Sequence, residues 1–392
     1  MTEERNGMGI YLDHAATSFP KAPGVAEAMA ELVLRGAVNV GRGGYEQAYD
    51  LMDRVIDTRD RLKRMFHAPE EYAACFTGGA TQGINQFLKG LLHPGDHVVV
   101  SSVEHNAVMR PLHTLEQAGV EVSIAVCDRE GKLKPEAVEE AIRPNTKAVL
   151  MSHASNVCGT ILPVREIAGI CHDHSIWFGV DAAQTAGILP IDMCRMGIDF
   201  LNVPGHKGLL GPQGVGAFIV SPDLAEEMNP LIEGGTGSSS DSEEQPDFLP
   251  DKFESGTLPL VAIIGLNAAL RFLDSREPEQ RLSEDRYLTG LFLEGLMGLP
   301  VRVAGIANPA RTGERTGVIS VDFSPLDNGI AAFSLEQDYG IMTRVGLHCA
   351  PRAHKTLGTF PEGTVRFSLG YGTTEEDIRT AIRAVQNICS GS

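Results

Sequence analysis

The sequence predicts an α/β protein with a mostly parallel central sheet and a smaller C-terminal α+β part. Short apolar runs alternate with helical patterns along the chain, which is the rhythm of strand–helix–strand units. At roughly 150 residues a domain, a chain of 392 residues predicts two or three domains. We therefore expect a large domain at 20–257 and a small domain made of 1–19 and 258–392.

Six apolar runs are predicted to form strands. They are His97–Ser101, Val120–Val126, Ala148–Ser152, Trp177–Asp181, Phe200–Val203 and Val215–Val220. Two predicted crossover helices, Pro135–Ile142 and Pro163–His174, each begin at a proline, which suits the first turn of a helix. Because such crossovers are right-handed, the strand ends share one edge of the sheet, and we expect the active site there.

Two further segments complete the organisation. A Gly-rich turn, Thr77–Thr81, precedes a predicted helix that runs to about Leu92, and a turn of this kind offers free backbone N–H groups to a phosphate. The segment Gly234–Asp247 is rich in Gly, Ser and acidic residues, and its sequence is compatible with either a disordered or a functional loop. After it, Leu258–Phe272 is predicted to be the helix that leads into the small domain.

Two residues capable of chemistry end neighbouring predicted strands. Asp181 closes Trp177–Asp181, and Lys207 follows the apolar run Ile198–Val203. A surface lysine is the ordinary interpretation of Lys207, but a desolvated lysine has a depressed pKa and is a nucleophilic amine. A pyridoxal phosphate (PLP) site needs an amine to bind the cofactor covalently and an anion to keep the pyridine nitrogen protonated. Lys207 and Asp181 supply both.

These two residues belong to a larger set of motifs. The set comprises Tyr11–Thr17, Phe76–Asn85, Glu104–Asn106, Ser155–Thr160, Asp181–Gln184, Gly205–Lys207, Phe253–Thr257, Arg344–Ala350 and Val365–Ser368, and it covers nearly the whole chain. It resembles the class V aminotransferase-fold enzymes, and especially the cysteine desulfurases. The resemblance implies fold type I of the PLP-dependent transferases.

The resemblance also implies cofactor-binding residues. It places the cofactor phosphate on Ala80, Thr81, His206 and, from the neighbouring subunit, Thr257. It makes His105 the residue that stacks on the pyridine ring and Gln184 the donor to the phenolic oxygen of the ring.

Two departures from the family pattern stand near these positions. Many relatives carry a hydroxyl residue where this chain has Pro204, so one phosphate hydrogen bond is expected to be missing. His14 stands where relatives usually have asparagine, and its role is left open.

Substrate recognition is assigned to Arg366 and Asn156. A guanidinium fork is the best clamp for an amino-acid carboxylate, and an amide fixes its orientation. Arg366 lies in an alternating stretch, so a surface arginine is the alternative interpretation.

Cys349 is the cysteine that separates members of the family. It lies in a loop-like sequence beside His348, a setting in which a thiol stays accessible and its pKa can drop. Cys158 is expected to line the site without reacting, and the other five cysteines are expected to be inert core residues. In cysteine desulfurases the cysteine at this position attacks the sulfur of the substrate.

The implied reaction converts L-cysteine to L-alanine. Lys207 moves the α-proton, Cys349 holds the sulfur as a persulfide, and an acceptor protein or a small thiol collects it. A selenocysteine lyase, a cysteine sulfinate-type lyase, another class V transferase and a non-catalytic partner subunit are the alternatives.

The amino-acid composition limits which partners and which cellular compartment are expected. A formal charge of -18 argues against a nucleic-acid partner, and seven cysteines without a Cys-x-x-Cys pair argue against a disulfide framework and a zinc site. A reducing compartment and a cytoplasmic location are expected. Neither the polar segment 1–9 nor the interrupted apolar run Leu258–Leu270 predicts a signal peptide or a membrane span. Because Thr257 is assigned to a neighbour's site, a homodimer is expected.

Overall fold

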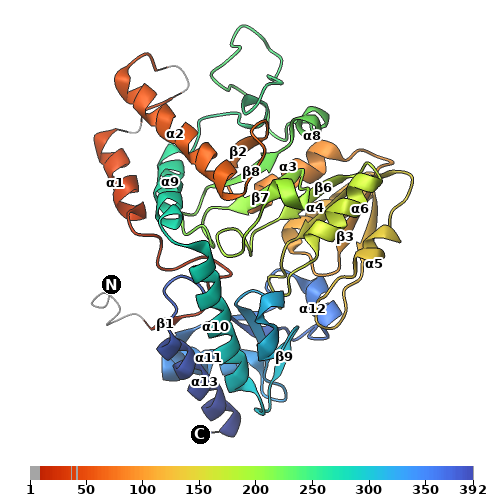
Figure 1. Cartoon of the computed structure of the whole chain (residues 1–392), viewed down its shortest axis with the longest axis vertical. Coiled ribbons are helices and arrows are strands. Elements are labelled where there is room, and N and C mark those ends of the chain that lie inside the picture. Colours follow the sequence, from red (N-terminus) through yellow and green to blue (C-terminus); the bar gives the residue numbers. More distant parts are fainter. Residues whose placement is uncertain (1–8, 37, 41–42, 392) are drawn as a thin grey trace.

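The computed structural model describes residues 9–36, 38–40 and 43–391. Residues 1–8, for which the sequence predicts no signal peptide, lie outside this range. Figure 1 shows a large domain above and a small domain below, with the helix α10 (Pro278–Leu296) reaching into the small one.

The large domain is built on a seven-stranded sheet. Its strands are β2 (Ala73–Thr77), β3 (His97–Ser101), β4 (Glu121–Ala125), β5 (Thr146–Ser152), β6 (Trp177–Asp181), β7 (Phe200–Pro204) and β8 (Gly216–Val220). The order is β2-β8-β7-β6-β5-β3-β4, and β8 alone runs antiparallel to its neighbours. All six predicted strands are therefore present, whereas β2 was not predicted.

Helices cover both faces of this sheet. They are α1 (Val25–Arg35), α2 (Glu46–Met65), α3 (Ala80–Leu91), α4 (Asn106–Gln117), α5 (Pro135–Glu139), α6 (Val164–Asp173), α7 (Met193–Met196), α8 (Pro222–Glu227) and α9 (Leu260–Asp274), with the 3-10 turn η1 (Asp251–Phe253). Successive strand residues point to opposite faces. Val98 and Val100 accordingly pack in one core with α3 and α4, and Val99 packs in the other with α2, α6 and α9.

The small domain has an antiparallel sheet of its own. Its elements are β1 (Ile10–Tyr11), β9 (Arg302–Ala304), η2 (Pro309–Glu314), β10 (Val318–Asp322), α11 (Asn328–Tyr339), β11 (Ile341–Met342), β12 (Arg344–Gly346), α12 (Pro351–Leu357), β13 (Thr364–Ser368) and α13 (Glu375–Ser390). The sheet order is β12-β13-β10-β9, and β1 pairs with β11 in parallel. A third apolar core joins Leu12, Phe292 and Phe367.

The packing of α9 bears on where the two domains meet. Ile263, Leu266 and Leu270 of α9 share the large-domain core with Leu51 and Val55 of α2. The predicted domain boundary at residue 258 stays a prediction. Because α9 belongs to the core of the large domain, a boundary between α9 and α10 is favoured. Within the described ranges, no helix combines the length and the apolar character needed to cross a membrane.

Candidate active site

The predicted site residues meet at the carboxyl edge of the central sheet. β6 and β7 pair in parallel with Asp181 opposite Asn202, so Asp181 and the turn that carries Lys207 leave the sheet on the same side. A cavity of about 640 Å³ opens there. Eight of the predicted residues line it: Ala80, Thr81, His105, Asn156, Asp181, Gln184, His206 and Lys207.

Lys207 is half-buried at this cavity. Burial lowers the pKa of its ammonium group to about 8, against the opposing charge of Asp181, and the guanidinium groups of Arg366 and Arg344 act in the same direction as burial. At pH 7 about a tenth of the amine is therefore unprotonated, far more than in an ordinary lysine, and a nucleophile or a general base requires this form.

Asp181 is buried at the end of β6. Its Oδ1 accepts hydrogen bonds from the backbone N–H of Ala183 at 3.1 Å and from Nδ2 of Asn202 at 3.2 Å. Burial raises the pKa of this carboxyl group, and the charge of Lys207 opposes the rise. A buried carboxylate of this kind is stabilised by a cation, such as a protonated ring nitrogen, placed against it.

The start of α3 forms an anion cradle. Gly79 precedes the helix with φ of 143°, a conformation that favours glycine, and no side chain caps the helix N-terminus. The first N–H groups of a helix lack intrahelical acceptors, so they are available to a phosphate. Ala80 and Thr81 lie in this first turn, as the sequence predicts.

His206 lines the same cavity and is held by Thr17 and Lys21, of which neither lines it. His206 Nδ1 lies 3.0 Å from Thr17 Oγ1, and burial is the main reason why the pKa of the His206 ring falls to about 4. The Lys21 ammonium group donates to Thr17 Oγ1, Ser18 Oγ and the His206 carbonyl at 3.0 to 3.2 Å. The sequence analysis did not single out Lys21, because nothing marks this residue except that it follows the motif Tyr11–Thr17 by four residues.

His105 is the N-cap residue of α4. Its Nδ1 accepts a hydrogen bond from the backbone N–H of Ala107 at 2.9 Å, so the ring proton is on Nε2. Burial, with the charge of Lys207, lowers the pKa of this ring to about 4. A neutral aromatic face at the cavity suits stacking on a pyridine ring. Gln184 is buried, lines the same cavity and donates from Nε2 to the carbonyl of Ala15 at 3.2 Å.

Arg366 lies just behind the cavity and already has two partners. Its Nη2 is 2.9 Å from Asp13 Oδ1, and its Nη1 donates to the carbonyl of Asn156 at 3.1 Å. Arg344 stands directly opposite Arg366 on the neighbouring strand. Only Arg366 is paired with Asp13, and the charge of Arg344 also acts on Arg366, so the positive charge of this region suits a substrate carboxylate. Sequence reasoning missed Asp13 and Arg344 as site residues, although both belong to the motifs quoted.

Asn156 holds the loop that carries Cys349. Its Nδ2 donates to the carbonyl of His348 at 2.8 Å. The carbonyl of Cys349 accepts from the N–H of Asn106 at 2.7 Å, which satisfies one of the open donors of α4. His348 and Cys349 both have left-handed backbones, with φ of 48° and 56°. These contacts and this strained geometry set Cys349 beside His105.

Two expectations about the cysteines are wrong. His348 is buried, its Nε2 lies 3.1 Å from Thr364 Oγ1, and burial lowers the pKa of its ring to about 2, so it offers no positive charge to the neighbouring thiol. The charge that interacts with Cys349 is instead that of Arg366. Cys194 is exposed rather than a core residue, because α7 is a short surface helix. Cys349 is exposed and Cys158 is buried.

Thr257 does not line the cavity of its own chain. It is exposed and follows a segment tied to the loop Gly234–Asp247. Gly256 N–H donates to the carbonyl of Gly235 at 2.8 Å, and Gln245 Nε2 donates to Ser255 Oγ at 3.0 Å. The loop and Thr257 therefore form one connected surface unit.

Comparisons with known proteins agree over the whole chain. The family model described as aminotransferase class-V matches residues 10–380. A probable cysteine desulfurase of Methanothermobacter thermautotrophicus is 32% identical over 97% of this chain and 94% of that protein. The cysteine desulfurase CsdA of Escherichia coli is 29% identical over 96% of this chain and 93% of that protein.

Solved structures agree as well. The apo structure of cysteine desulfurase from Thermococcus onnurineus NA1 has a TM-score of 0.90 and 29% identity, and the match covers 100% of this chain and 98% of that chain. The S-sulfonic acid structure of E. coli CsdA has a TM-score of 0.86 and 28% identity, with the same coverage. These matches confirm the predicted α/β architecture and fold type. The chain belongs to the class-V aminotransferase family and, within it, to the cysteine desulfurases.

Proposed function

We propose that this chain is a PLP-dependent cysteine desulfurase, which converts L-cysteine to L-alanine and takes up the sulfur on Cys349 as a persulfide. The observation that carries the proposal is the position of Cys349. Its thiol is exposed, while hydrogen bonds to Asn106 and Asn156 hold its loop against the cavity that contains Lys207.

The residues of the cavity fit PLP. Lys207 supplies the amine, Asp181 a carboxylate for the ring nitrogen, His105 a neutral ring to stack on it, and the start of α3 with His206 a cradle for the phosphate. Gln184 would donate to the phenolic oxygen. When bound, PLP supplies an electron sink for the carbon skeleton of the substrate.

The residues of the chain then have separate tasks. Arg366, with Arg344 beside it, would hold the substrate carboxylate, and the Lys207 amine would take the α-proton and return a proton later. The Cys349 thiolate would attack the sulfur of the substrate. In this step an S–S bond forms and the Cβ–S bond breaks; its electron pair stays with the carbon skeleton, which takes up a proton at Cβ to become alanine. An acceptor protein or a small thiol would remove the persulfide sulfur.

A side-by-side assay tests this proposal. Purified protein is given L-cysteine, L-selenocysteine or L-cysteine sulfinate, and alanine is measured together with the released sulfide, selenide or sulfite. We expect alanine from L-cysteine in equal amount to transferred sulfur. Turnover of L-selenocysteine or L-cysteine sulfinate, with no turnover of L-cysteine, would favour the lyase alternatives. If none of the three substrates is turned over, a non-catalytic partner subunit would be favoured.

Arg366→Ala is expected to weaken L-cysteine binding by about 10- to 100-fold. A hydrogen bond to a charged group contributes roughly 1.5–3 kcal/mol, and about 1.4 kcal/mol corresponds to a tenfold change. The measurement is KM and kcat for L-cysteine. Arg379→Ala, which removes an exposed arginine from α13, is the control and should leave both unchanged. Unchanged KM and kcat in Arg366→Ala would show that another residue holds the carboxylate.

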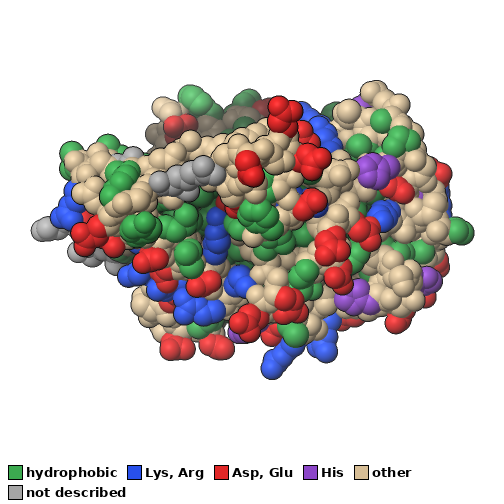
Figure 2. Space-filling model, turned by 90° about the horizontal axis from the view of Figure 1, so that it is seen from above, with side chains coloured by type: hydrophobic (Ala, Val, Ile, Leu, Met, Phe, Trp, Pro, Cys, Tyr) green, Lys and Arg blue, Asp and Glu red, His purple; other side chains and the backbone are tan. Residues whose placement is uncertain are grey.

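We also propose that the working unit is a homodimer in which Thr257 completes the phosphate site of the neighbour. Thr257 leads into α9, which packs on α1 and α2. These two helices and the residue before α2 carry exposed apolar side chains: Val33, Leu34, Tyr45, Tyr49 and Ile56. In Figure 2, hydrophobic side chains are visible at the surface on this side, between acidic and basic ones. Such a surface suits a two-fold interface.

Leu34→Glu is expected to shift the protein toward poorly active monomers, because it places a charge on this apolar surface. Leu34 is 85% exposed, and Met297, which is 66% exposed at the end of α10, provides the matched control Met297→Glu. Light scattering gives the mass of each variant at the concentration of the activity assay. A fully active monomer would contradict the shared site. The sulfur acceptor and the cytoplasmic location also stay predictions.

A further inference from the structure

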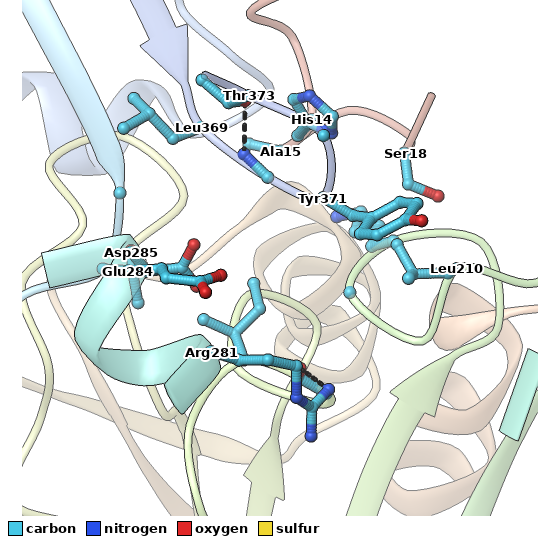
Figure 3. Close-up of a pocket in the computed structure, with 18 of the residues that line it drawn as sticks. His14, Ala15, Ser18, Leu210, Arg281, Glu284, Asp285, Leu369, Tyr371 and Thr373 are labelled. Atoms are coloured by element: carbon cyan, nitrogen blue, oxygen red, sulfur yellow. Dashed lines mark hydrogen bonds between the residues drawn. The ribbon is translucent and has the colours of Figure 1, made fainter. Parts of the chain in front are cut away.

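A second cavity, of about 270 Å³, lies between the two domains on the far side of Lys207. It shares Ala183, Gln184 and Lys207 with the active-site cavity. Figure 3 shows its other walls: Arg281, Glu284 and Asp285 come from α10, and Tyr371 and Thr373 from the segment after β13. Nothing in the proposed reaction uses this space.

Arg281 lines this cavity, and part of its guanidinium group has no hydrogen-bond acceptor among the described residues. Its Nη1 donates to the carbonyl of Gly187 at 3.2 Å. Its Nε is buried and has no acceptor among the described residues. Nη2 likewise has no acceptor among the described residues and, unlike Nε, it is not buried, so an acceptor of a ligand can reach it.

Asp285 provides an open acceptor one turn further along the same helix. Its carboxylate forms no ion pair within 4.0 Å among the described residues, although the charges of Arg281 and Arg276 act on it at longer range. Burial raises the pKa of this carboxyl group to about 6, so it is mostly ionised at neutral pH. In Figure 3 the carboxylates of Glu284 and Asp285 point into the space between α10 and Tyr371.

Lys207, Arg276 and Glu284 are the other charged residues that line this cavity, and Arg276 and Glu284 are paired with each other. The two charged groups lie 3.6 Å apart, and the Arg276 guanidinium group also stands over the Tyr371 ring at 5.3 Å from its centre. This pair neutralises itself. Arg281 and Asp285 attract each other at longer range, but among the described residues neither has an oppositely charged group within 4.0 Å, so they are the cation and the anion left for a ligand.

We propose that this cavity binds a small neutral amino acid as its zwitterion, with the carboxylate on Arg281 and the ammonium group on Asp285. Residues i and i+4 of a helix lie about 5–6 Å apart at Cβ, so one small molecule reaches both. An anion alone would leave Asp285 unmatched, and a cation alone would leave Arg281 unmatched. The volume is just below the range of about 300–1,000 Å³ that is typical of pockets for drug-sized ligands, which favours a short side chain.

Occupancy of this site is expected to act on the active site. The ligand would lie against the chain segments that carry Gln184 and Lys207 on their other side. Binding at the two sites would then be coupled, and the coupling would be reciprocal. The choice of L-alanine as the probe rests on the proposed function, since L-alanine is its product.

The test is equilibrium dialysis of the holoenzyme with labelled L-alanine. The absorbance of the cofactor, read in the same samples, reports binding at the active site alone. We expect two L-alanine molecules per protomer in the wild type. Arg281→Gln and Asp285→Asn should each weaken one of the two by at least tenfold and keep the absorbance change. Arg286→Gln, an exposed position on the same helix, is the matched control and should keep both.

Each of the remaining outcomes either supports or overturns the second amino-acid site. A single molecule per protomer that changes the cofactor absorbance, or two molecules that neither variant affects, overturns the inference and leaves the proposed function standing. Acetate that competes as well as L-alanine, with Asp285→Asn unaffected, overturns it in favour of a plain anion site. L-alanine that binds once, is lost in Arg281→Gln and leaves the absorbance unchanged supports the inference and contradicts the proposed function. Unchanged thermal midpoints of the variants confirm that they are folded.

Discussion

Cys349→Ala is expected to lose sulfide release from L-cysteine, while the first change of cofactor absorbance on adding L-cysteine remains. The loss should exceed about 100-fold, since even a misplacement of a reacting group by about 1 Å can cost that much. Binding survives because Lys207, Asp181 and Arg366 are untouched. Selenocysteine should suffer less, because the weaker carbon–selenium bond breaks more readily without an attacking thiolate.

Mass spectrometry identifies the cysteine that accepts the sulfur. Wild-type protein mixed with L-cysteine, without reductant, should carry about 32 Da more on the peptide with Cys349, the mass of one sulfur atom. Cys194→Ala is the matched control, because Cys194 is also exposed but lies on α7, which contributes nothing to the cavity. Persulfide on Cys158 or Cys194 only, or normal sulfide release from Cys349→Ala, would contradict the mechanism.

Lys207→Ala is expected to abolish turnover and to leave noncovalent binding of PLP. Loss of a positioned proton-transfer group costs roughly 10²- to 10⁴-fold, and loss of the covalent link to the cofactor adds to it. The contacts proposed for the phosphate and the ring would remain, because they involve α3, His105 and Asp181. Activity and the cofactor content after gel filtration are the measurements.

Borohydride reduction followed by peptide mapping locates the lysine directly. The reduced cofactor should be found on Lys207 in the wild type. Lys21→Met, which removes the other half-buried ammonium group near His206, should keep the label on Lys207. A label on Lys63 or Lys355 would show that the cofactor is anchored elsewhere and would overturn the assignment of the site.

Local patterns in the sequence were enough to predict the frame of the active site. Apolar runs of four to seven residues correspond to β3 to β8, because most of these strands are buried on both faces and such strands have nearly continuous apolar sequences. Asp181 and Lys207 follow two of these runs, and the parallel order of strands brings them to one edge. The same reasoning missed β2 (Ala73–Thr77) and treated part of it as a phosphate turn, because the turn chemistry of Gly78 and Gly79 dominates that stretch.

The sequence by itself therefore predicted six of the seven strands of the central sheet and carried the family motifs, since strand patterns and turn chemistry depend on neighbours in the chain. Only the tertiary structure showed which ionisable groups of the site are paired and which are neutral. Asp13 contacts Arg366 across 353 residues of sequence, and burial keeps the ring of His348 neutral, although this residue stands beside Cys349 in the sequence. Arg281 and Asp285 face a cavity only because α10 packs against the back of the active site. Desolvation and ion pairing depend on which distant segments pack together, and spacing along the chain carries no record of that.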